Sequence, residues 1–534
     1  MNQRIACFIA SVTVLIISTT AQAQHDPQRN ATWDVAAGKY EAALKTLDKA
    51  EADEAETHFL QLLIALQQGK LEAGVSHAKA ALDAGMPFER LVAGPREILA
   101  PLYKTDAYQT WKQKAGNPQL IHGPMLGNVT SNSASFWVRT AKASNVQIRV
   151  ARDIADNIKL SEIELKTEAG IVTQATKTSA DTDFATVLKV TGLKPGTRYR
   201  YQIVIDKQAQ RTKNSIFTTS PKEHTASKFR IAFGGGAGYI PEWEYMWNTI
   251  GKEKPHAMLM LGDNVYIDAP EQSLTSRYCY YRRQSRPEWQ RFTASTAMFS
   301  IYDDHDFGKN DCVPGPEIET PSWKRKVWNE FKNNWANPAY GGGEKQPGCW
   351  YDFYIGDVHF IMLDGRYYRN KKGDNPSMLG PVQKKWLFDT LKNSKGTFKV
   401  LASPVPFTEK IKPGSKDPWD GYPAEREEIF SFIETENING LFLICADRHR
   451  SDLRITKREN GYDLYEFESS RLTNRHTHAV VKTPGLVWGY NKTCSFGLMT
   501  FDTKADDPQV KFEVLTIDGE RMHEHVLKLS ELQK

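Results

Sequence analysis

The sequence predicts a multidomain α/β protein. Its largest part should be a four-layer α/β/β/α sandwich, preceded by an all-β sandwich and an N-terminal helical module. The chain has 534 residues, which is more than a single hydrophobic core usually organises. Its apolar residues change from helical spacing to alternation near residue 117. From residue 228 onward, strand-like and helix-like stretches follow one another, and two sheets with helices on their outer faces accommodate that order.

Residues 1–23 have the pattern of an export signal peptide. Arg4 precedes an apolar run over residues 5–17, and the small residues of Ala21-Gln22-Ala23 follow it. We therefore expect a periplasmic or secreted protein whose mature chain begins near Gln24. Downstream of this segment, the sequence has no stretch that is long and apolar enough to predict a membrane span.

Charge and cysteine content narrow the function classes. The net charge is +5, and the 69 basic and 64 acidic residues are interspersed, so no specific recognition of nucleic acid is evident. The basic excess weakly favours an anionic substrate. Five cysteines follow the signal segment, so at least one should be free, and Cys445 in an apolar run is the expected buried thiol. An exported protein permits a disulfide among the other four, which are Cys279, Cys312, Cys349 and Cys494.

Residues 24–115 predict a helical module. The segments GKYEAALKTLDKA and GKLEAGVSHAKAALDAG echo one another at about the length of a helical-hairpin repeat. They loosely resemble tetratricopeptide repeats, which would imply a groove for contact with a protein or peptide. A short helical cap on the neighbouring domain is the alternative interpretation.

Residues 119–220 predict a β-sandwich, because residues 134–138 and 146–150 alternate as half-buried strands do. A turn with the sequence LKPGT at 193–197 precedes a strand over 198–205 that begins Arg-Tyr-Arg-Tyr. This phrase resembles fibronectin type III domains and their tyrosine corner. The segment carries no visible chemistry.

Residues 228–534 predict an α/β domain, in which strands and helices alternate. We expect the late strands at 462–468, 496–502 and 510–517 to complete its second sheet. The other expected strands are 229–233, 257–261, 298–302, 350–355, 358–363, 398–402 and 441–445, and the expected helices are 242–251, 323–335, 381–392 and 424–434.

Oxygen and imidazole ligands follow three of these strands. The segments are AMLMLGDNVYID at 257–268, YDDHDFGKND at 302–311 and LICADRHRSD at 443–452. In open α/β sheets, sites form where the carboxyl ends of strands meet. Such ligands suit Ca, Mg, Mn, Zn or Fe rather than soft metals.

The order GDxxY, DDHD and ADRH resembles the metallophosphoesterase superfamily. Tyr266, three residues after Asp263, is similar to the tyrosine of purple acid phosphatases and alkaline phosphatase D. The segments FYIGDVHFIMLDGRYYR and LGPVQKKWL look like the alkaline phosphatase D family in particular. The resemblance covers residues 119–520. It implies an exported alkaline phosphatase or phosphodiesterase that hydrolyses phosphate esters by a metal-activated hydroxide, with Ca, Fe, Mn or Zn as cofactors.

The resemblance also implies roles for single residues. Asp263 would bridge two metals, and Tyr266 would bind the first as a phenolate. His305 would act as general acid. Asp304 would bind the second metal with Asn310 or Asp311 as a helper, Asp447 and His449 would complete the ligand set, and Arg366 and Arg448 would hold phosphate oxygens.

Three of these roles have a plainer alternative. Tyr266 could serve packing, His305 could begin a solvated helix, and Arg366 could pair with a carboxylate. His256 and His359 lie in or beside strands and are expected to be structural.

The chain departs from the family at the end of its first strand. Relatives carry a metal ligand there, whereas this chain has the glycine run Gly234-Gly235-Gly236. Glycines could allow close backbone approach to metal or substrate, or could offer amides to an anion. They could also mean that the first metal is weakly held, absent or of another type. The alternative function is therefore a catalytically weakened envelope protein that binds an anionic ligand or polymer.

Overall fold

The computed structural model describes residues 26–49, 54–153, 170–212, 215–371, 373, 376–483 and 485–534. The predicted export signal lies outside these residues. Within them, no helix combines the length and the apolar character that crossing a bilayer requires. The five cysteines in this part are all unpaired, and Cys445 is buried as predicted.

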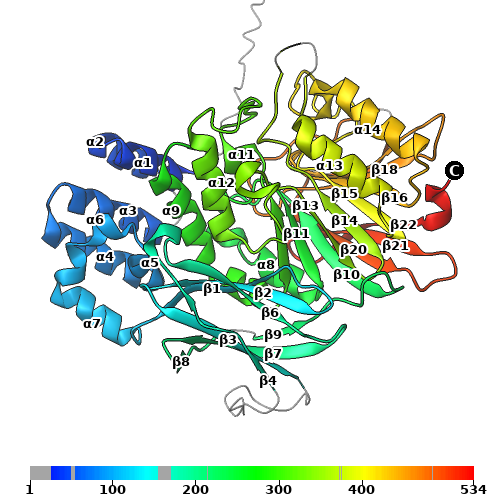
Figure 1. Cartoon of the computed structure of the whole chain (residues 1–534). Coiled ribbons are helices and arrows are strands. Elements are labelled where there is room, and N and C mark those ends of the chain that lie inside the picture. The colour runs from blue at the N-terminus through cyan, green and yellow to red at the C-terminus, as the bar shows by residue number, and fades with distance from the viewer. Residues whose placement is uncertain are drawn as a thin grey trace, which may run out of the picture.

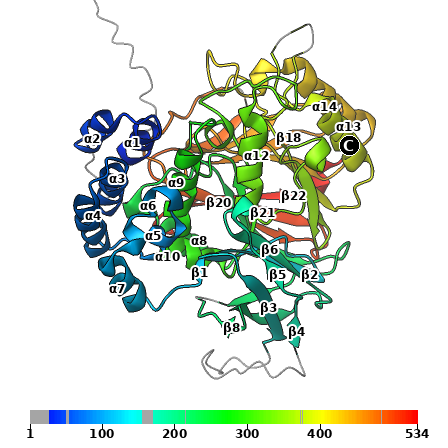
Figure 2. The ribbon, with the colours of Figure 1, turned by 60° about the vertical axis from the view of Figure 1, so that its left-hand side comes forward.

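Helices at the N-terminal end form a group at one side of the molecule (Figures 1 and 2). They are α1 (Pro27–Ala36), α2 (Tyr40–Leu47), α3 (Glu54–Gln67), α4 (Leu71–Asp83), α5 (Glu89–Ala93), α6 (Arg96–Leu99) and α7 (Asp106–Lys114). Helix α1 packs on α9 (Ser273–Gln284), where the hydroxyls of Thr32 and Thr275 lie 2.7 Å apart. Arg282 of α9 donates to Asp26 at the start of α1. These contacts favour the helical-cap interpretation.

A sheet of nine described strands passes through the centre of the molecule (Figure 1). In order across the sheet they are β22 (Arg521–Lys528), β21 (Gln509–Thr516), β20 (Ser495–Asp502), β10 (Lys228–Gly234), β11 (Ala257–Leu261), β12 (Ala297–Ile301), β1 (Leu120–Gly127), β2 (Ser133–Thr140) and β6 (Ala185–Thr191). The strands β10, β11 and β12 are parallel, with Phe233 beside Leu259 and Leu259 beside Phe299. Their carboxyl ends therefore meet at one edge.

A smaller sheet accompanies the first strands. It contains β3 (Asn145–Arg152), β4 (Gly170–Val172), β5 (Thr176–Lys177), β7 (Arg198–Ile205), β8 (Gln208–Ala209) and β9 (Ile216–Thr218). The backbone amide of Lys194 donates to the hydroxyl of Tyr199 at 2.9 Å, as in a tyrosine corner. However, β1 pairs with β12 through Gly127 and Met298, so one sheet continues from this region into the next. The domain boundaries and the fibronectin-like character stay predictions.

A sheet of seven described strands faces the first. Its order is β13 (Tyr351–Ile355), β14 (Val358–Met362), β15 (Phe398–Ala402), β16 (Leu441–Cys445), β18 (Leu464–Ser469), β17 (Ser451–Thr456) and β19 (Leu486–Tyr490). The rings of Phe299 and Phe353 stack at 3.9 Å between the two sheets. Helices α13 (Gly380–Lys392) and α14 (Pro423–Thr435) cover the outer face through Leu387 and Ile429. The four-layer prediction is confirmed.

The prediction that all three late strands complete the second sheet is wrong for two of them. Only the segment 462–468 joins it, as β18, whereas 496–502 and 510–517 become β20 and β21 of the first sheet. Strand β20 pairs along β10 from Lys228 to Phe233 and thereby satisfies that strand's backbone groups. Because the sheets face each other, an apolar strand can bury its side chains from either one.

Helices also occur between β11 and β12, where the sequence predicted no element. Helix α9 and helix α10 (Pro287–Thr293) occupy most of that segment. The α9 sequence SLTSRYCYYRRQ is polar, so it does not predict a buried helix. Arg282 and Arg283 are nevertheless buried, because they form ion pairs with Asp26 and Glu244. The remaining helices of this domain include α8 (Met246–Lys252), α11 (Asp304–Phe307) and α12 (Trp323–Asn334).

Candidate metal centre

The candidate site lies where strands of both large sheets end. Asp263 follows β11, Asp303 and Asp304 follow β12, and Asp447 and His449 follow β16. Strand β11 runs parallel to β12 in the first sheet, and β16 runs parallel to β15 in the second. The ends of the two facing sheets meet here, so Tyr266 lies 3.0 Å from His449, 183 positions away in the chain. The sequence-predicted ligands come together for this reason.

Asp263, Tyr266 and His449 form a buried, hydrogen-bonded group. The hydroxyl of Tyr266 donates to Asp263 Oδ2 at 2.9 Å and lies 3.0 Å from His449 Nε2. Asp263 and His449 hold φ angles of 52° and 48°, which non-glycine residues adopt at a cost of about 1–3 kcal/mol. The surrounding structure holds this conformation, and it directs both side chains toward the same space.

Asp304 and His305 begin helix α11. Ligand atoms of Asp263, Asp304 and His305 lie within 4.8 Å of one another, a spacing that one metal ion can bridge. Asp306 anchors the neighbouring turns, because its carboxylate accepts from the amides of Asn264, Val265 and Asp303 at 2.8–3.1 Å. Asp303 and Asp306 also form a capping box, a sequence signal that the prediction did not use.

His305 has a carboxylate partner outside the predicted set. Its Nδ1 lies 2.5 Å from Asp268 Oδ1, and Arg29 of helix α1 donates to Asp268 Oδ2 at 2.7 Å. Burial opposes the charged imidazole, but the carboxylates of Asp268, Asp304 and Asp263 raise the pKa of His305 well above its ordinary value. The N-terminal module thus contributes to the surroundings of the predicted general acid.

Arg366 pairs with carboxylates, the alternative to phosphate binding. Its side chain is 0% exposed, and it donates to Asp303 Oδ1 at 2.5 Å and to Asp417 Oδ1 at 2.7 Å. Arg369 binds the same Asp417 carboxylate. The predicted contact of Arg366 with phosphate therefore has no support from its observed partners.

Arg448 and Lys412 lie beside Asp447. Arg448 donates to Asp447 Oδ2 at 3.4 Å, and its Nε is buried without a hydrogen-bond partner. Burial disfavours the Asp447 carboxylate, but the charges of Lys412 and Arg448 outweigh it and lower the pKa of Asp447. Lys412 also donates to Asp311 Oδ1 at 2.9 Å.

The structure separates the two alternatives for the helper ligand. Asn310 is exposed to solvent. Asp311 instead offers its amide to Asp304 Oδ2 at 2.5 Å, and its carboxylate lies within 4.8 Å of Asp304 and Asp417 ligand atoms. Ligation by Asn310 stays a prediction without support from its position.

The donor set fits a metal ion. Asp263 Oδ1, Asp304 Oδ1 and His449 Nδ1 are buried without a hydrogen-bond partner in the described part of the chain. Burying such atoms unsatisfied costs free energy that a bound cation would offset. Burial, strengthened by Asp304 and Asp447 and opposed by His305, raises the pKa of Asp263 to about 7, so the pocket favours neutralisation of its charge. Carboxylate, phenol and imidazole suit hard and borderline metals.

Two histidines beyond the predicted motifs join the site. His476 and His478 follow β18, and their ring nitrogens lie within 4.8 Å of His449 and of each other. Burial lowers the pKa of His449 to about 3, that of His476 to about 4 and that of His478 to about 2, so all three rings are neutral. The His-Thr-His spacing in the sequence was the available signal, since alternate residues of an extended segment point to one side.

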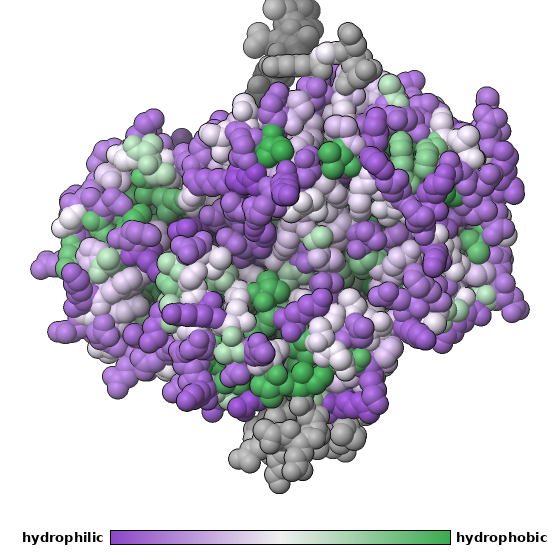
Figure 3. Space-filling model, viewed as in Figure 1, coloured by the Kyte–Doolittle hydropathy of each residue, from purple (hydrophilic) through white to green (hydrophobic). Residues whose placement is uncertain are grey.

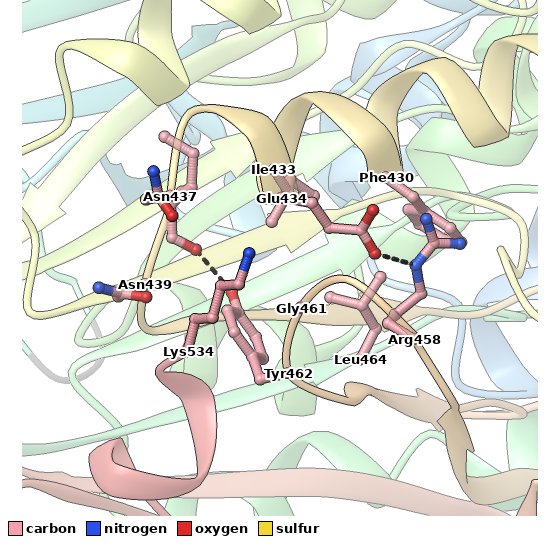
Figure 4. Close-up of a pocket in the computed structure, with 11 residues that line it drawn as sticks. Phe430, Ile433, Glu434, Asn437, Asn439, Arg458, Gly461, Tyr462, Leu464 and Lys534 are labelled. Carbon is pink, nitrogen blue, oxygen red and sulfur yellow. Dashed lines mark hydrogen bonds and ion pairs between the residues drawn. The ribbon is translucent and has the colours of Figure 1, made fainter.

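A small crevice elsewhere in the structure is not part of the candidate metal centre. It lies between α14 and the C-terminal end, where Tyr462 donates to the carbonyl of Ile438 and Arg458 pairs with Glu434 (Figure 4). Its lining contains no candidate ligand. The molecular face drawn in Figure 3 is largely hydrophilic, with apolar residues in scattered groups.

Comparisons with known proteins agree with this geometry. Residues 231–485 match the family described as PhoD-like phosphatase, and residues 117–221 match a domain of unknown function, DUF7800. Alkaline phosphatase D of Bacillus subtilis (strain 168) is 24% identical over 312 residues, which cover 49% of this chain and 52% of that protein. Purple acid phosphatase 13 of Arabidopsis thaliana is 25% identical over 203 residues, covering 33% and 35%. The chain thus spans about half or less of these curated relatives.

Two solved structures share the fold. The structure titled "Structure of PhoD" has a TM-score of 0.62 at 18% identity and covers 76% of this chain and 88% of its own. A purple acid phosphatase from yellow lupin (Lupinus luteus) seeds has a TM-score of 0.57 at 12% identity, with coverages of 77% and 75%.

Proposed function

We propose that this chain, whose residues 231–485 belong to the PhoD-like phosphatase family, is a metal-dependent phosphoester hydrolase. The observation that carries the proposal is the convergence of Asp263, Asp304 and His305 at the strand ends, where their carboxylate and imidazole atoms lie within 4.8 Å of one another. Metal-binding carboxylates and a proton donor therefore meet at one place. A hydrolase needs carboxylates that bind metal beside an imidazole that donates a proton, whereas a module that only binds an anion needs neither.

Asp263, Tyr266, Asp304, Asp447 and His449 would hold the metal ions. When bound, the metals neutralise charge on the phosphate oxygens and lower the pKa of water for attack on phosphorus. Asp263 lies between the Tyr266 and His449 side and the Asp304 side, which suits a shared ligand. Ca, Fe, Mn or Zn are the proposed ions, since each accepts such donors.

His305 would deliver a proton to the leaving-group oxygen. Asp268 occupies Nδ1, so Nε2 is the ring atom left for this transfer. The raised pKa of His305 keeps the ring protonated at neutral pH, as a general acid requires. Arg29, which binds Asp268, would position the imidazole without touching substrate.

Arg448 would hold a non-bridging phosphate oxygen. Its Nε has no hydrogen-bond partner, so it retains a donor for a ligand. Lys412 is a second cation beside the acidic residues. Arg366 would act instead through Asp303 and Asp417, by holding their carboxylates in place.

Export completes the proposal, together with a protein contact through faces of the helical module that do not pack on α9. The export signal pattern of residues 1–23 supports a periplasmic or secreted location. N-terminal sequencing of the mature protein from its compartment tests it, with a start near Gln24 as the expected result.

Metal analysis of the purified chain and a panel of aryl and alkyl phosphate monoesters and diesters test the hydrolase. We expect stoichiometric metal and turnover that a chelator abolishes and metal restores. Metal-loaded protein that binds inorganic phosphate but turns over no ester would contradict the proposal and favour the binding-protein alternative.

A further inference from the structure

The glycine run at the end of β10, Gly234-Gly235-Gly236, leaves no room for a side-chain ligand. A Cβ on Gly235 would lie 2.6 Å from the Cβ of Ala446, and one on Gly236 would lie 2.9 Å from Ser470 Oγ and 3.1 Å from His449. Gly236 also has a φ of 66°, which L side chains rarely adopt. The glycines therefore do more than remove a ligand, because they let other chain segments approach closely.

The segment that approaches is the one after β18. The amide of Leu472 donates to the carbonyl of Gly235 at 3.0 Å, and the hydroxyl of Thr473 donates to the carbonyl of Gly238 at 2.6 Å. This pairing sets the path of the following residues toward His449.

The same segment is fixed at His449 itself. The hydroxyl of Thr477 donates to the carbonyl of His449 at 3.1 Å, and Asn491 donates to the carbonyl of His478 at 2.9 Å. Thr477 is exposed while His476 and His478 on either side are half-buried, so both imidazoles face inward. Their ring centres lie 5.4 and 5.7 Å from that of His449.

The spacing of the nitrogens matches a metal site. His476 Nε2 and His478 Nε2 lie 3.2 Å apart, and two ligands at 2.0–2.1 Å from a tetrahedral zinc ion lie about 3.3 Å apart. His449 is 4% exposed, and its Nδ1 has no hydrogen-bond partner. Tyr266, 3.0 Å from His449 Nε2, is a neighbouring oxygen donor.

We propose that His449, His476 and His478 form a three-imidazole site for a borderline transition-metal ion such as Zn²⁺, and that the last two replace the ligand that the first strand lacks. The site deepens the proposed function and rests on it only for the catalytic use of the ion. Imidazole ligands suit zinc and iron better than calcium, so the site also assigns this end of the centre to a different ion class from the acidic end.

Zn²⁺ binding to the metal-free full chain tests the proposal. The double variant His476→Ala/His478→Ala should lose one equivalent of tightly bound Zn²⁺, with a drop in affinity that exceeds the roughly 10- to 100-fold cost of losing an outer-shell partner. X-ray absorption of the zinc-loaded wild type should count three imidazoles on this ion, and the variant should lack that three-imidazole signal. The control is His58→Ala/His77→Ala, which removes two histidines with ring centres 5.9 Å apart in the helical module; it should bind Zn²⁺ as the wild type does.

Unchanged zinc stoichiometry and imidazole count in the site variant would overturn the proposal, as would a wild type that binds no zinc through imidazole. Circular dichroism of each variant checks that the fold persists. The outcome is separate from the proposed function: three-imidazole zinc binding without ester turnover would support this site and refute the hydrolase, and turnover with unchanged zinc binding in the variant would do the reverse.

Discussion

The two ends of the candidate metal centre are built from different chemistry. The acidic end contains Asp303, Asp304, Asp311 and Asp417, and the protein's own cations Arg366, Arg369 and Lys412 pair with it. The histidine end contains His449, His476 and His478, whose rings are neutral, and the hydroxyl of Tyr266 lies 3.0 Å from His449 Nε2.

At the acidic end, arginine and lysine side chains compensate the charge of the carboxylates before any metal binds. The neutral rings at the histidine end carry no charge to compensate. A cation at the acidic end must share carboxylates with Arg366 and Lys412, whereas a metal at the histidine end needs no such exchange. The ends should therefore differ in ion preference, with a hard ion suited to the carboxylates and a borderline ion to the imidazoles. Asp263 and Tyr266 lie between them.

Asp263→Asn should have the largest effect, because it removes the carboxylate that joins the two ends. We expect metal loss at both and a fall in ester turnover of about a thousandfold or more, equivalent to about 4 kcal/mol of transition-state stabilisation. Metal analysis and turnover of an alkyl phosphate measure this.

In the metal-free form, the same substitution should stabilise the folded protein at alkaline pH. The folded-state pKa of Asp263 is raised from 3.8 to about 7, so the metal-free wild type loses stability as pH rises between these values. Asparagine removes that cost, and metal-free Asp263→Asn should unfold at a higher temperature than metal-free wild type above pH 7. A full metal complement in the variant would exclude Asp263 from the centre.

His305→Ala should reduce activity without removing metal from either end. General acid catalysis contributes about a hundredfold to ten-thousandfold, and the loss should shrink for leaving groups that depart well unprotonated. Alkyl phosphates should thus suffer more than nitrophenyl phosphates when rates are compared at equal metal content. An equal deficit for both, or loss of metal, would make His305 a ligand or an orienting residue.

Asp268→Asn should act through His305 and produce a smaller effect. Asp268 is the leading cause of the raised imidazole pKa, so its loss should lower that pKa and move the alkaline limb of the pH profile to lower pH. The proton on His305 is present below the folded pKa and lost as pH rises through it. We expect about a tenfold loss of turnover on the alkaline side and little change below the limb. A limb that stays in place would remove Asp268 from this role.

The smallest effects should come from the edge of the acidic end. Asp311→Asn should weaken metal binding there, because its carboxylate faces Asp304 and Asp417. Asn310→Ala should change metal affinity and turnover by less than about twofold, as most exposed substitutions do. Calorimetric titration with Ca²⁺ and Mn²⁺ compares the two. A stronger effect at Asn310 than at Asp311 would identify Asn310 as the helper ligand of Asp304.

Local patterns in the sequence were enough to predict most of the fold and several of the residues that gather at the candidate site. The apolar run before Asp263 and the segments around Asp304 and Asp447 predicted strands that end in ligands, and the structure brings these residues together. The order of strands and helices also predicted two facing sheets, because a strand needs a buried face and a parallel pair needs a crossover.

Tertiary structure decided the rest, because those features depend on partners far apart in the chain. The sheet that β20 joins depends on the open edge of β10, and Arg366 turns to Asp303 and Asp417 because a buried guanidinium requires carboxylates. The neighbourhood of His449, His476 and His478 depends on a loop that the glycine run admits. Sequence spacing specifies which groups a strand end carries, but long-range packing and the desolvation of charge select which of them meet.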